Sequence, residues 1–403
     1  MAKKYMVLKG DCLDRLKELP DNSIDSVVTD PPYGLSKEPD IVEVLTKWMN
    51  GEPYDHGHGG FMGKRWDSFV PHPDIWREVH RMLKPGGHAL VFAGTRTQDL
   101  MTIALRLAGF EVRDVIEWLY FSGFPKSMDV SKAFDKRADA GREKIGEYTI
   151  RGTVDIQGGN YNSGKTAIKT LNITAPATEL AKKWDGWGTA LKPAHEPIIV
   201  ARKPLECTVC DNVERWGTGA INIDDCRIGS DEMKWKPRGQ SVTYAKTTYD
   251  ASRQGELNIG RFPANIVSTE SEDDGAFWAK YATVTPKEIS KKAFKKDRNS
   301  DWRGNPIDLE EKTTDDGQKK PIDNPFLRGE TKRVNSHPTV KPTDLMAWLV
   351  RLVTPPGGTI LDPFAGSGST LVAAKREGFG FIGIEREPEY VEIIEARTGE
   401  VAQ

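Results

Sequence analysis

Residues 23–34 read SIDSVVTDPPYG and join a largely apolar run to a short polar motif. The run from Ile24 to Val28 is typical of a strand buried on both faces, as strands of parallel sheets are. Asp30, two prolines and Tyr33 follow it directly. The sequence therefore predicts a buried strand that ends by presenting a carboxylate and an aromatic ring.

Strands and helices alternate on both sides of this motif. Before residue 122, further strands are expected at 4–11, 88–94 and 111–121, and helices at 12–19, 72–83 and 97–108. Gly86 and Gly87 are expected as stop signals after the helix at 72–83, and another strand is expected at 195–204. After residue 343, the expected order is a helix (344–358), a strand running into a Gly-rich turn (358–370), a helix (371–378) and a strand (379–385). This alternation predicts an α/β fold with a Rossmann-like, doubly wound and mostly parallel sheet.

A second motif, LDPFAGSGST at residues 361–370, lies between a predicted strand and a predicted helix. Gly366 and Gly368 would let a ligand approach the backbone at the helix N-terminus. Glu385 ends the next strand about twenty residues later, where an acidic side chain can accept both hydroxyls of a ribose. Because the final glycine of a GxGxxG pyrophosphate loop is missing, the pattern favours a nucleoside cofactor without a diphosphate. The alternative is a turn that is Gly-rich only to pack a helix on a strand.

The residues of DPPY suit chemistry on an exocyclic amine. Asp30 can accept a hydrogen bond from such an amine, and Pro31 can direct its carbonyl at the same nitrogen. Tyr33 can stack on a planar base. Two acceptors would draw the nitrogen toward tetrahedral geometry and free its lone pair for in-line attack on an activated methyl group. The structural alternative is a proline-rich turn after a strand.

These motifs occur with others in an order that resembles a known family. The stretches are GDCLDRLKELPDNSIDSVVTDPPYG, LKPGGHALVFAGTRT, GWGTALKPAHEPIIVARKP, HPTVKPTDLMAWLVRLVTPPGGTILDPFAGSGST and FIGIEREPEY. Together they resemble the amino-group DNA methyltransferases of the β arrangement, in particular phage and prophage forms. In that family the DPPY half precedes the FxGxG half, with a target-recognition region between them, as the motifs at 30–33 and 364–368 do here.

The resemblance implies a division of the chain and a set of site residues. Residues 1–125 would form the catalytic half, 126–183 a flexible insertion, 184–204 a return to the core, 205–333 an inserted target-recognition region, and 334–403 the cofactor-binding half. The residues that would hold and stack the target base are Asp30, Pro31, Pro32 and Tyr33. Those that would bind S-adenosylmethionine are Asp11, Asp362, Phe364, Ala365, Gly366, Ser367, Gly368, Glu385, Thr339 and Lys341. In its first residue, Asp30, the DPPY motif resembles adenine-N6 members of the family more than cytosine-N4 members. Adenine is therefore the expected target base, and cytosine stays the alternative.

Other signals point to weaker hypotheses. GNYNSGKT, residues 159–166, matches the P-loop pattern around Lys165, but no clear strand and helix flank it, so a Gly/Asn-rich loop is favoured over an NTPase. Cys207 and Cys210 lack a second pair at zinc spacing, so no metal site is predicted. A lysine-rich run would give a helix a basic face for DNA phosphates; its members are Lys287, Lys291, Lys292, Lys295 and Lys296.

Composition limits the class of protein. The chain has 403 residues, a formal net charge of −2 and four cysteines, and it contains no apolar stretch long enough to cross a membrane. These features predict a soluble, untargeted protein of the bacterial or phage-infected cytoplasm, without a membrane partner. The partner implied by the resemblance is double-stranded DNA, with the target base flipped out. Dimerisation is common in similar enzymes, so a homodimer is an open expectation, and a non-catalytic DNA-binding protein is a remote one.

Overall fold

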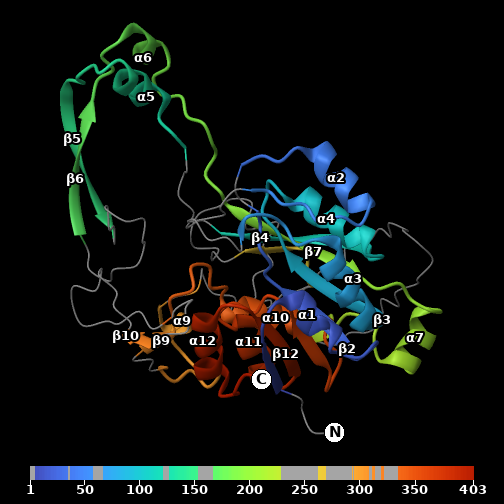
Figure 1. Cartoon of the computed structure of the whole chain (residues 1–403). Helices are drawn as coiled ribbons and strands as arrows, with labels where there is room; N and C mark the ends of the chain where they lie inside the picture. The colour runs from blue at the N-terminus through green and yellow to red at the C-terminus, as the bar shows by residue number, and fades with distance from the viewer. Residues whose placement is uncertain are drawn as a thin grey trace, which may run out of the picture. The chain divides into compact units, whose positions relative to one another are not determined.

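A computed structural model of the chain divides into two compact units (Figure 1). It describes residues 5–34, 37–57, 67–120, 127–152, 167–227, 262–268, 293, 295–307, 311–313, 319–321 and 335–403. The larger unit comprises Met1–Tyr120, His195–Lys319 and His337–Gln403, and the smaller one Phe121–Ala194 and Lys320–Ser336. The described residues of the predicted recognition region 205–333, as far as Lys319, belong to the larger unit.

Eight strands of the described residues form one sheet in the larger unit. In sheet order they are β1 (Tyr5–Lys9), β12 (Gly380–Glu385), β11 (Thr359–Asp362), β2 (Ile24–Thr29), β3 (Leu83–Phe92), β7 (His195–Arg202), β4 (Glu111–Leu119) and β8 (Ile266–Ser268). Strand β7 runs antiparallel to both of its neighbours, and the other neighbouring pairs are parallel. The predicted doubly wound, mostly parallel sheet is confirmed.

The chain leaves β2 and β11 in opposite directions along the sheet. From β2 it continues through α2 (Ile41–Met49) and α3 (Pro73–Met82) to β3, whereas from β11 it continues through α11 (Ser369–Glu377) to β12. Because β2 and β11 are parallel neighbours, their carboxyl ends meet at a topological switch point. Open α/β sheets bind their ligands outside this point.

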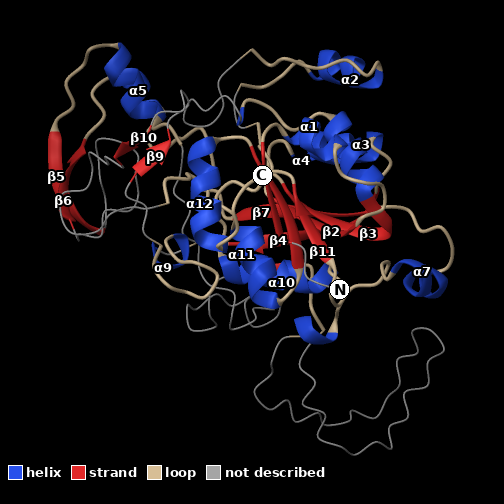
Figure 2. Ribbon diagram, turned by 60° about the horizontal axis from the view of Figure 1, so that its bottom comes forward, coloured by secondary structure: helices blue, strands red, loops and turns tan. Residues whose placement is uncertain are grey.

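Helices cover both faces of the sheet, as Figure 2 shows. One face packs against α1 (Cys12–Lys17), α2, α3 and α4 (Gln98–Leu107), and the other against α10 (Thr343–Val353), α11 and α12 (Pro388–Thr398). Trp76 of α3 is fully buried on the first face, and Trp348 of α10 is buried on the second. Hydrophobic burial on both faces accounts for the apolar sequences of the central strands.

Strand β3 begins earlier than predicted. The expected helix ran to Leu83 and the strand began at 88, but α3 ends at Met82 and Leu83 already pairs with Ile24 of β2. Gly86, expected as a helix stop, lies within β3 at φ +77°, where an added Cβ would lie 2.5 Å from the amide nitrogen of Asn212. Asn212 belongs to α7 (Val209–Trp216) and donates to Pro85 O over 2.9 Å. Because residue 86 is a glycine, α7 can pack against β3 at this point. The local sequence around Gly86 does not indicate this contact.

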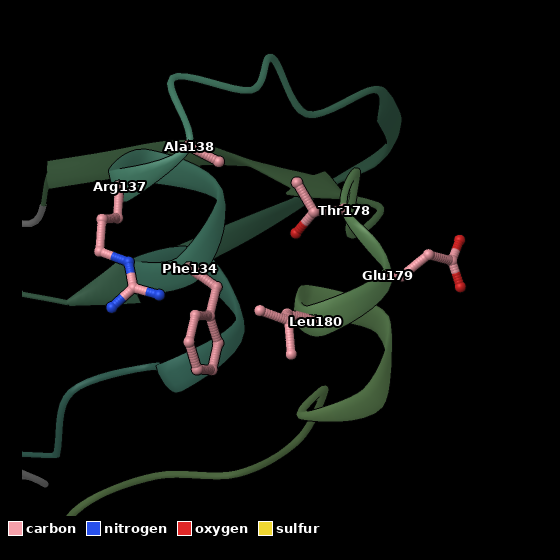
Figure 3. Close-up of a pocket in the computed structure, with 6 residues that line it drawn as sticks. All are labelled: Phe134, Arg137, Ala138, Thr178, Glu179 and Leu180. Atoms are coloured by element: carbon pink, nitrogen blue, oxygen red, sulfur yellow. The ribbon is translucent and has the colours of Figure 1, made fainter.

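The smaller unit contains a hairpin and two short helices. Strands β5 (Lys144–Gly152) and β6 (Ala167–Thr174) are antiparallel, and α5 (Val130–Arg137) packs beside α6 (Glu179–Lys183). Buried Asp135 joins the helices, because it accepts from Arg142 over 2.7 Å and from Thr178 N over 2.9 Å. These elements were not predicted for the 126–183 insertion, whose sequence has no sustained period. This unit contains a pocket of about 280 Å³. Figure 3 shows the six residues that line it: Phe134, Arg137, Ala138, Thr178, Glu179 and Leu180.

The remaining described elements are short. They are a 3-10 turn at Asp224–Cys226, α9 (Lys295–Arg298), β9 (Glu311–Thr313) and β10 (Lys319–Pro321). Among the described helices, none has the length and apolar character needed to cross a membrane.

Candidate active site

The loop Asp30–Gly34 follows β2 directly and is fixed by two side chains from elsewhere in the chain. The Asp67 carboxylate accepts from the backbone N–H groups of Tyr33, over 2.8 Å, and Gly34, over 3.3 Å. The Thr97 hydroxyl donates to Tyr33 O over 2.5 Å. Gly34 has φ +65°, and an added Cβ would lie 3.0 Å from the backbone of Phe69. The conformation of this loop is thus set by its surroundings as well as by its prolines.

Asp30 belongs to a cluster of four side chains. Its Oδ1 accepts from the Tyr33 hydroxyl over 2.7 Å, and its Oδ2 accepts from Lys341 Nζ over 2.6 Å. Glu196 Oε2 lies 3.2 Å from Lys341 Nζ and 3.1 Å from the Tyr33 hydroxyl. We call Asp30, Tyr33, Glu196 and Lys341 the carboxylate cluster. With both carboxylates ionised and the lysine protonated, its net charge is −1.

Burial governs the electrostatics of this cluster. The side chains of Lys341, Asp30 and Glu196 are only 8%, 19% and 16% exposed. Burial, partly offset by Lys341 and reinforced by Glu196, raises the pKa of Asp30. Burial alone would lower the pKa of Lys341, but the two carboxylates outweigh it and raise that pKa. Lys341 is therefore protonated, and its positive charge stabilises the ionised form of Asp30 in a site that is largely shielded from water.

Aromatic rings border the cluster. Lys341 Nζ lies 4.9 Å from the centroid of the Phe92 ring and 5.2 Å from that of the Tyr33 ring. Tyr120, which is buried after β4, hydrogen-bonds to Glu196, and burial together with this carboxylate raises the pKa of the Tyr120 hydroxyl. The surroundings combine hydrogen-bond acceptors with flat apolar surfaces, which suits a planar heterocycle that carries an amine.

The second motif begins beside the first, at the carboxyl end of β11. Buried Asp362 accepts from the Thr29 hydroxyl over 2.7 Å and from Phe364 N over 3.1 Å. Burial raises the pKa of Asp362 to about 6. The Phe364 ring packs against Trp76 at 6.1 Å between centroids. The two sequence motifs, over 300 residues apart, are thus joined by a side-chain hydrogen bond.

The Gly-rich turn is held against the end of β12. Ala365 N donates to Ile384 O over 2.9 Å, and Gly366 N donates to Glu385 Oε2 over 2.8 Å. Burial raises the pKa of Glu385 to about 7, although the backbone N–H groups of Glu387 and Gly366 act in the opposite direction. Gly366 has φ +54°, and a Cβ there would lie 2.8 Å from His337 Nε2. A half-buried carboxylate beside a Gly-rich turn fits a ribose of a nucleoside cofactor.

The other predicted cofactor residues lie around this turn or near it. Ser367 is buried and its carbonyl accepts from Arg397 over 2.8 Å, while Gly368, at φ +78°, precedes α11. Asp11 is exposed and caps α1, and Gly10 N donates to Glu385 O over 3.0 Å, which places the start of α1 beside the end of β12. Thr339 is exposed, and its backbone N–H donates to His337 Nδ1. Lys341, predicted near the methionine end of the cofactor, contacts Asp30, Tyr33 and Glu196 of the carboxylate cluster.

Several predicted features fall elsewhere. Lys287, Lys291, Lys292 and the P-loop-like segment 159–166 lie outside the described residues, and only the backbone of Lys295 and Lys296 is described, in α9. Cys207 and Cys210 are exposed. Among the residues that the structure describes, no group of three or more His, Cys, Asp or Glu side chains could hold a metal ion.

Glu196 was missed as a site residue. The sequence HEPIIV predicted only a strand, and an acidic residue at the start of a strand is ordinarily a solvated one. Its role depends on β7 running antiparallel to its neighbours, because this direction brings the first residues of β7 to the edge where the parallel strands end. Asp67 and Thr97 were also missed, because the loop that they hold is distant from them in sequence.

Two curated methyltransferases are similar to this chain in sequence. The Type II methyltransferase M.HindIII of Haemophilus influenzae is 24% identical over 415 residues, which cover 98% of this chain and 94% of that protein. M2.DpnII of Streptococcus pneumoniae, also a Type II methyltransferase, is 42% identical over 94 residues, 22% of this chain and 34% of that protein.

Solved structures of similar extent include two methyltransferases. The complex of M1.HpyAVI with SAM gives a TM-score of 0.39 at 15% identity, covering 98% of this chain and 99% of that one. The cytosine-N4-specific PvuII DNA methyltransferase gives 0.43 at 15% identity, covering 98% and 89%. The model of the N6/N4 family, described as DNA methylase, matches residues 24–396. Since this match spans most of the chain, including both motifs, the protein belongs to the N6/N4 DNA methylase family.

Proposed function

We propose that this DNA methyltransferase moves a methyl group from S-adenosylmethionine to N6 of adenine in DNA, and that the carboxylate cluster is its amine-binding site. Family membership gives the transferase activity, the methyl donor and the DNA substrate. The observation that carries the proposed site is the position of Asp30 at the switch point. Asp30 follows β2, and β2 pairs with β11, the strand that leads into the Gly-rich turn. Adenine is favoured because an aspartate leads DPPY, and cytosine N4 is the alternative on the same fold.

The chain's own residues can position the amine. Asp30 accepts one N–H of the target amine and Pro31 O the other, while the Tyr33 ring stacks on the base. Since an amine paired within a duplex cannot reach a buried carboxylate, the base must be flipped out of the helix, at a cost of a few kcal/mol. The nitrogen lone pair then forms the new N–C bond while the bond between the methyl carbon and the sulfonium sulfur breaks and leaves its electron pair on sulfur. The nitrogen loses one proton, which passes by way of Asp30 to water. Positioning and hydrogen bonding supply the catalysis without a covalent enzyme intermediate.

The proposed cofactor site lies around the Gly-rich turn. Glu385 accepts the ribose hydroxyls, the backbone at Gly366 and Gly368 approaches the cofactor, and Phe364 and Asp11 border its adenine. Thr339 and Lys341 lie toward its methionine end. Bound S-adenosylmethionine supplies an electrophilic methyl group on a sulfonium. The remaining members of this site are Asp362, Ala365 and Ser367, which fix the shape of the turn through the contacts described above.

The proposal also covers the part of the chain that recognises DNA and the cellular role of the enzyme. The recognition region is placed at 205–333, and the lysine-rich run there supplies phosphate contacts that steepen the salt dependence of binding. We expect the enzyme to act in the cytoplasm of a bacterial or phage-infected cell, as a homodimer. Its relatives are Type II methyltransferases, which favours a restriction-linked role over a regulatory or protective one.

Mass spectrometry of nucleosides tests the reaction. Unmethylated DNA is incubated with the protein and S-adenosylmethionine, beside Asp30→Ala and beside Asp114→Ala, which alters an exposed aspartate of β4. N6-methyladenine is expected from the wild type and from Asp114→Ala, and is expected to be lost in Asp30→Ala. N4-methylcytosine would keep the site and overturn the base, whereas full activity of Asp30→Ala would overturn the site.

A further inference from the structure

We propose that Glu196 is a positioning residue, which holds Lys341 and Tyr33 against Asp30 and keeps the amine-binding cluster negatively charged. This inference rests on the proposed function of Asp30. Glu196 lies near the start of β7, 166 positions along the chain from Asp30, in the stretch at 186–204, for which the sequence predicted no site residue.

The direction of β7 delivers Glu196 to the site. In the register of the sheet Glu196 is opposite Trp118 of β4, and Ile198 is opposite Phe92, the last residue of β3. Ala93 N donates to Pro197 O over 3.0 Å, so the first residues of β7 are fixed at the edge where β3 ends. A parallel strand would bring its last residues to this edge. Strand β7, because it is antiparallel to both neighbours, thus contributes a carboxylate from near its first residue.

Glu196 contacts both groups that contact Asp30. Its Oε2 is 3.2 Å from Lys341 Nζ, which is 2.6 Å from Asp30 Oδ2, and 3.1 Å from the Tyr33 hydroxyl, which is 2.7 Å from Asp30 Oδ1. All three charged side chains are at most 19% exposed. In such surroundings a carboxylate between two polar partners fixes the orientation of both.

The shared cation has a consequence for charge. If Lys341 paired with Asp30 alone, the pair would be neutral, and Asp30 would be a weaker acceptor for the amine. Because Lys341 also pairs with Glu196, the cluster keeps a net charge of −1. A negative cluster stabilises the positive charge that develops on the nitrogen as it is methylated, and the effect is large where water is excluded.

The charge of Glu196 acts on Asp30 together with other nearby groups. The Tyr120 hydroxyl, just after β4, hydrogen-bonds to Glu196, and the Asp362 carboxyl, at the end of β11, interacts with Asp30. The Lys341 ammonium carries the opposite charge to both carboxylates of the cluster. Glu196 raises the pKa of Asp30. Removal of this charge should therefore lower that pKa, which gives a readout that a loss of packing alone would not produce.

Glu196→Gln tests the proposal, because it removes the charge and keeps the shape. Expected are a kcat about 10- to 100-fold lower than wild type, an affinity for S-adenosylmethionine within about twofold, and an acid limb of the pH profile of kcat/KM displaced to lower pH. The matched control is Glu117→Gln on neighbouring β4, whose carboxylate lies 3.6 Å from His195 and is 35% exposed. This control should keep the wild-type kcat and pH profile.

Two outcomes would overturn the proposal: an unchanged kcat and acid limb in Glu196→Gln, or an equal loss in Glu117→Gln. Should Glu196→Gln fail to fold, Glu196→Asp restores the charge on a shorter side chain. We then expect a wild-type acid limb with a lowered kcat, and wild-type values of both would count against a positioning role. Absence of any methylated base with the wild-type enzyme would instead refute the proposed function, so the two failures are distinguishable.

Discussion

The Thr29 hydroxyl donates a hydrogen bond of 2.7 Å to Asp362 Oδ1 and thereby joins the ends of β2 and β11. Both residues are buried, and each immediately precedes one of the two loops from which the site is built. Since the backbone pairing of these strands places Leu361 opposite Val27, the hydrogen bond extends the contact toward the ligand edge. The relative position of the amine-binding loop and the Gly-rich turn depends on this contact.

Thr29→Val should destabilise the fold. It removes the donor while nearly keeping the shape, so Asp362 retains only Phe364 N and Thr370 as described partners. Loss of one partner from a buried carboxyl is expected to lower the free energy of unfolding by about 1–3 kcal/mol, measured by urea denaturation. Thr102→Val, which removes a hydroxyl bonded only locally to Gln98 O in α4, is the control and should cost less. Equal losses would contradict a special role for the Thr29 contact.

Binding of S-adenosylmethionine should weaken at low pH. The ribose hydroxyls require an ionised acceptor, but the pKa of Glu385, which is half-buried, is raised to about 7. Below this pKa a growing fraction of the free protein holds a proton that binding must displace, so affinity at pH 6 should be about tenfold lower than at pH 8. Calorimetric titration at several pH values measures this, and Glu385→Gln should bind weakly and without the pH dependence. A constant wild-type affinity would show that Glu385 does not bind the ribose as an anion.

Lys341→Met should destabilise the protein more strongly at high pH than at low pH. Loss of the ammonium leaves the Asp30 and Glu196 carboxylates together in a buried site, which is expected to cost about 3–5 kcal/mol. Without Lys341 the pKa of Asp30 rises further above its unfolded value. Stability of the variant is then retained below the unfolded pKa and lost as pH rises through the folded one.

Urea denaturation of Lys341→Met at pH 5 and pH 8 measures this difference. Lys375→Met is the control, because Lys375 pairs with Glu400, whose side chain is 28% exposed. The control should lose less stability, with a weaker pH dependence. A deficit of the same size at both pH values in Lys341→Met would show that the lysine acts through packing alone.

The sequence predicted the strands and helices that are determined by their own local pattern of apolar and polar residues. Apolar runs located the strands around both motifs, and the expected strand at 195–204 closely matches β7, His195–Arg202. Periodicity contains no information about direction, however, so the antiparallel course of β7 and the place of Glu196 in the site could not be predicted. The early start of β3 was missed because Gly86 is required by Asn212 of α7, a contact between residues distant in sequence. For the site, the sequence named Asp30, Tyr33 and Lys341 but not their mutual contacts.

Gly366→Ala should abolish tight binding of S-adenosylmethionine. An added Cβ would lie 2.8 Å from His337 Nε2, and that ring is buried against Tyr390 at 4.5 Å between centroids, so it has little room to move. Displacement of the turn would also break the 2.8 Å bond from Gly366 N to Glu385, which leaves the carboxylate misplaced for a ribose. Calorimetric titration is expected to show an affinity at least tenfold lower.

Gly357→Ala separates this steric effect from backbone strain. Gly357 has φ +73°, close to the +54° of Gly366, but an added Cβ there has no atom within 4 Å among the described surroundings. Both variants therefore incur the strain of a left-handed conformation, about 1 kcal/mol of unfolding free energy, and only Gly366→Ala meets an obstacle at the ligand edge. If Gly357→Ala weakened S-adenosylmethionine binding as much as Gly366→Ala, general destabilisation would explain both results. If neither did, the cofactor would not approach the backbone at Gly366.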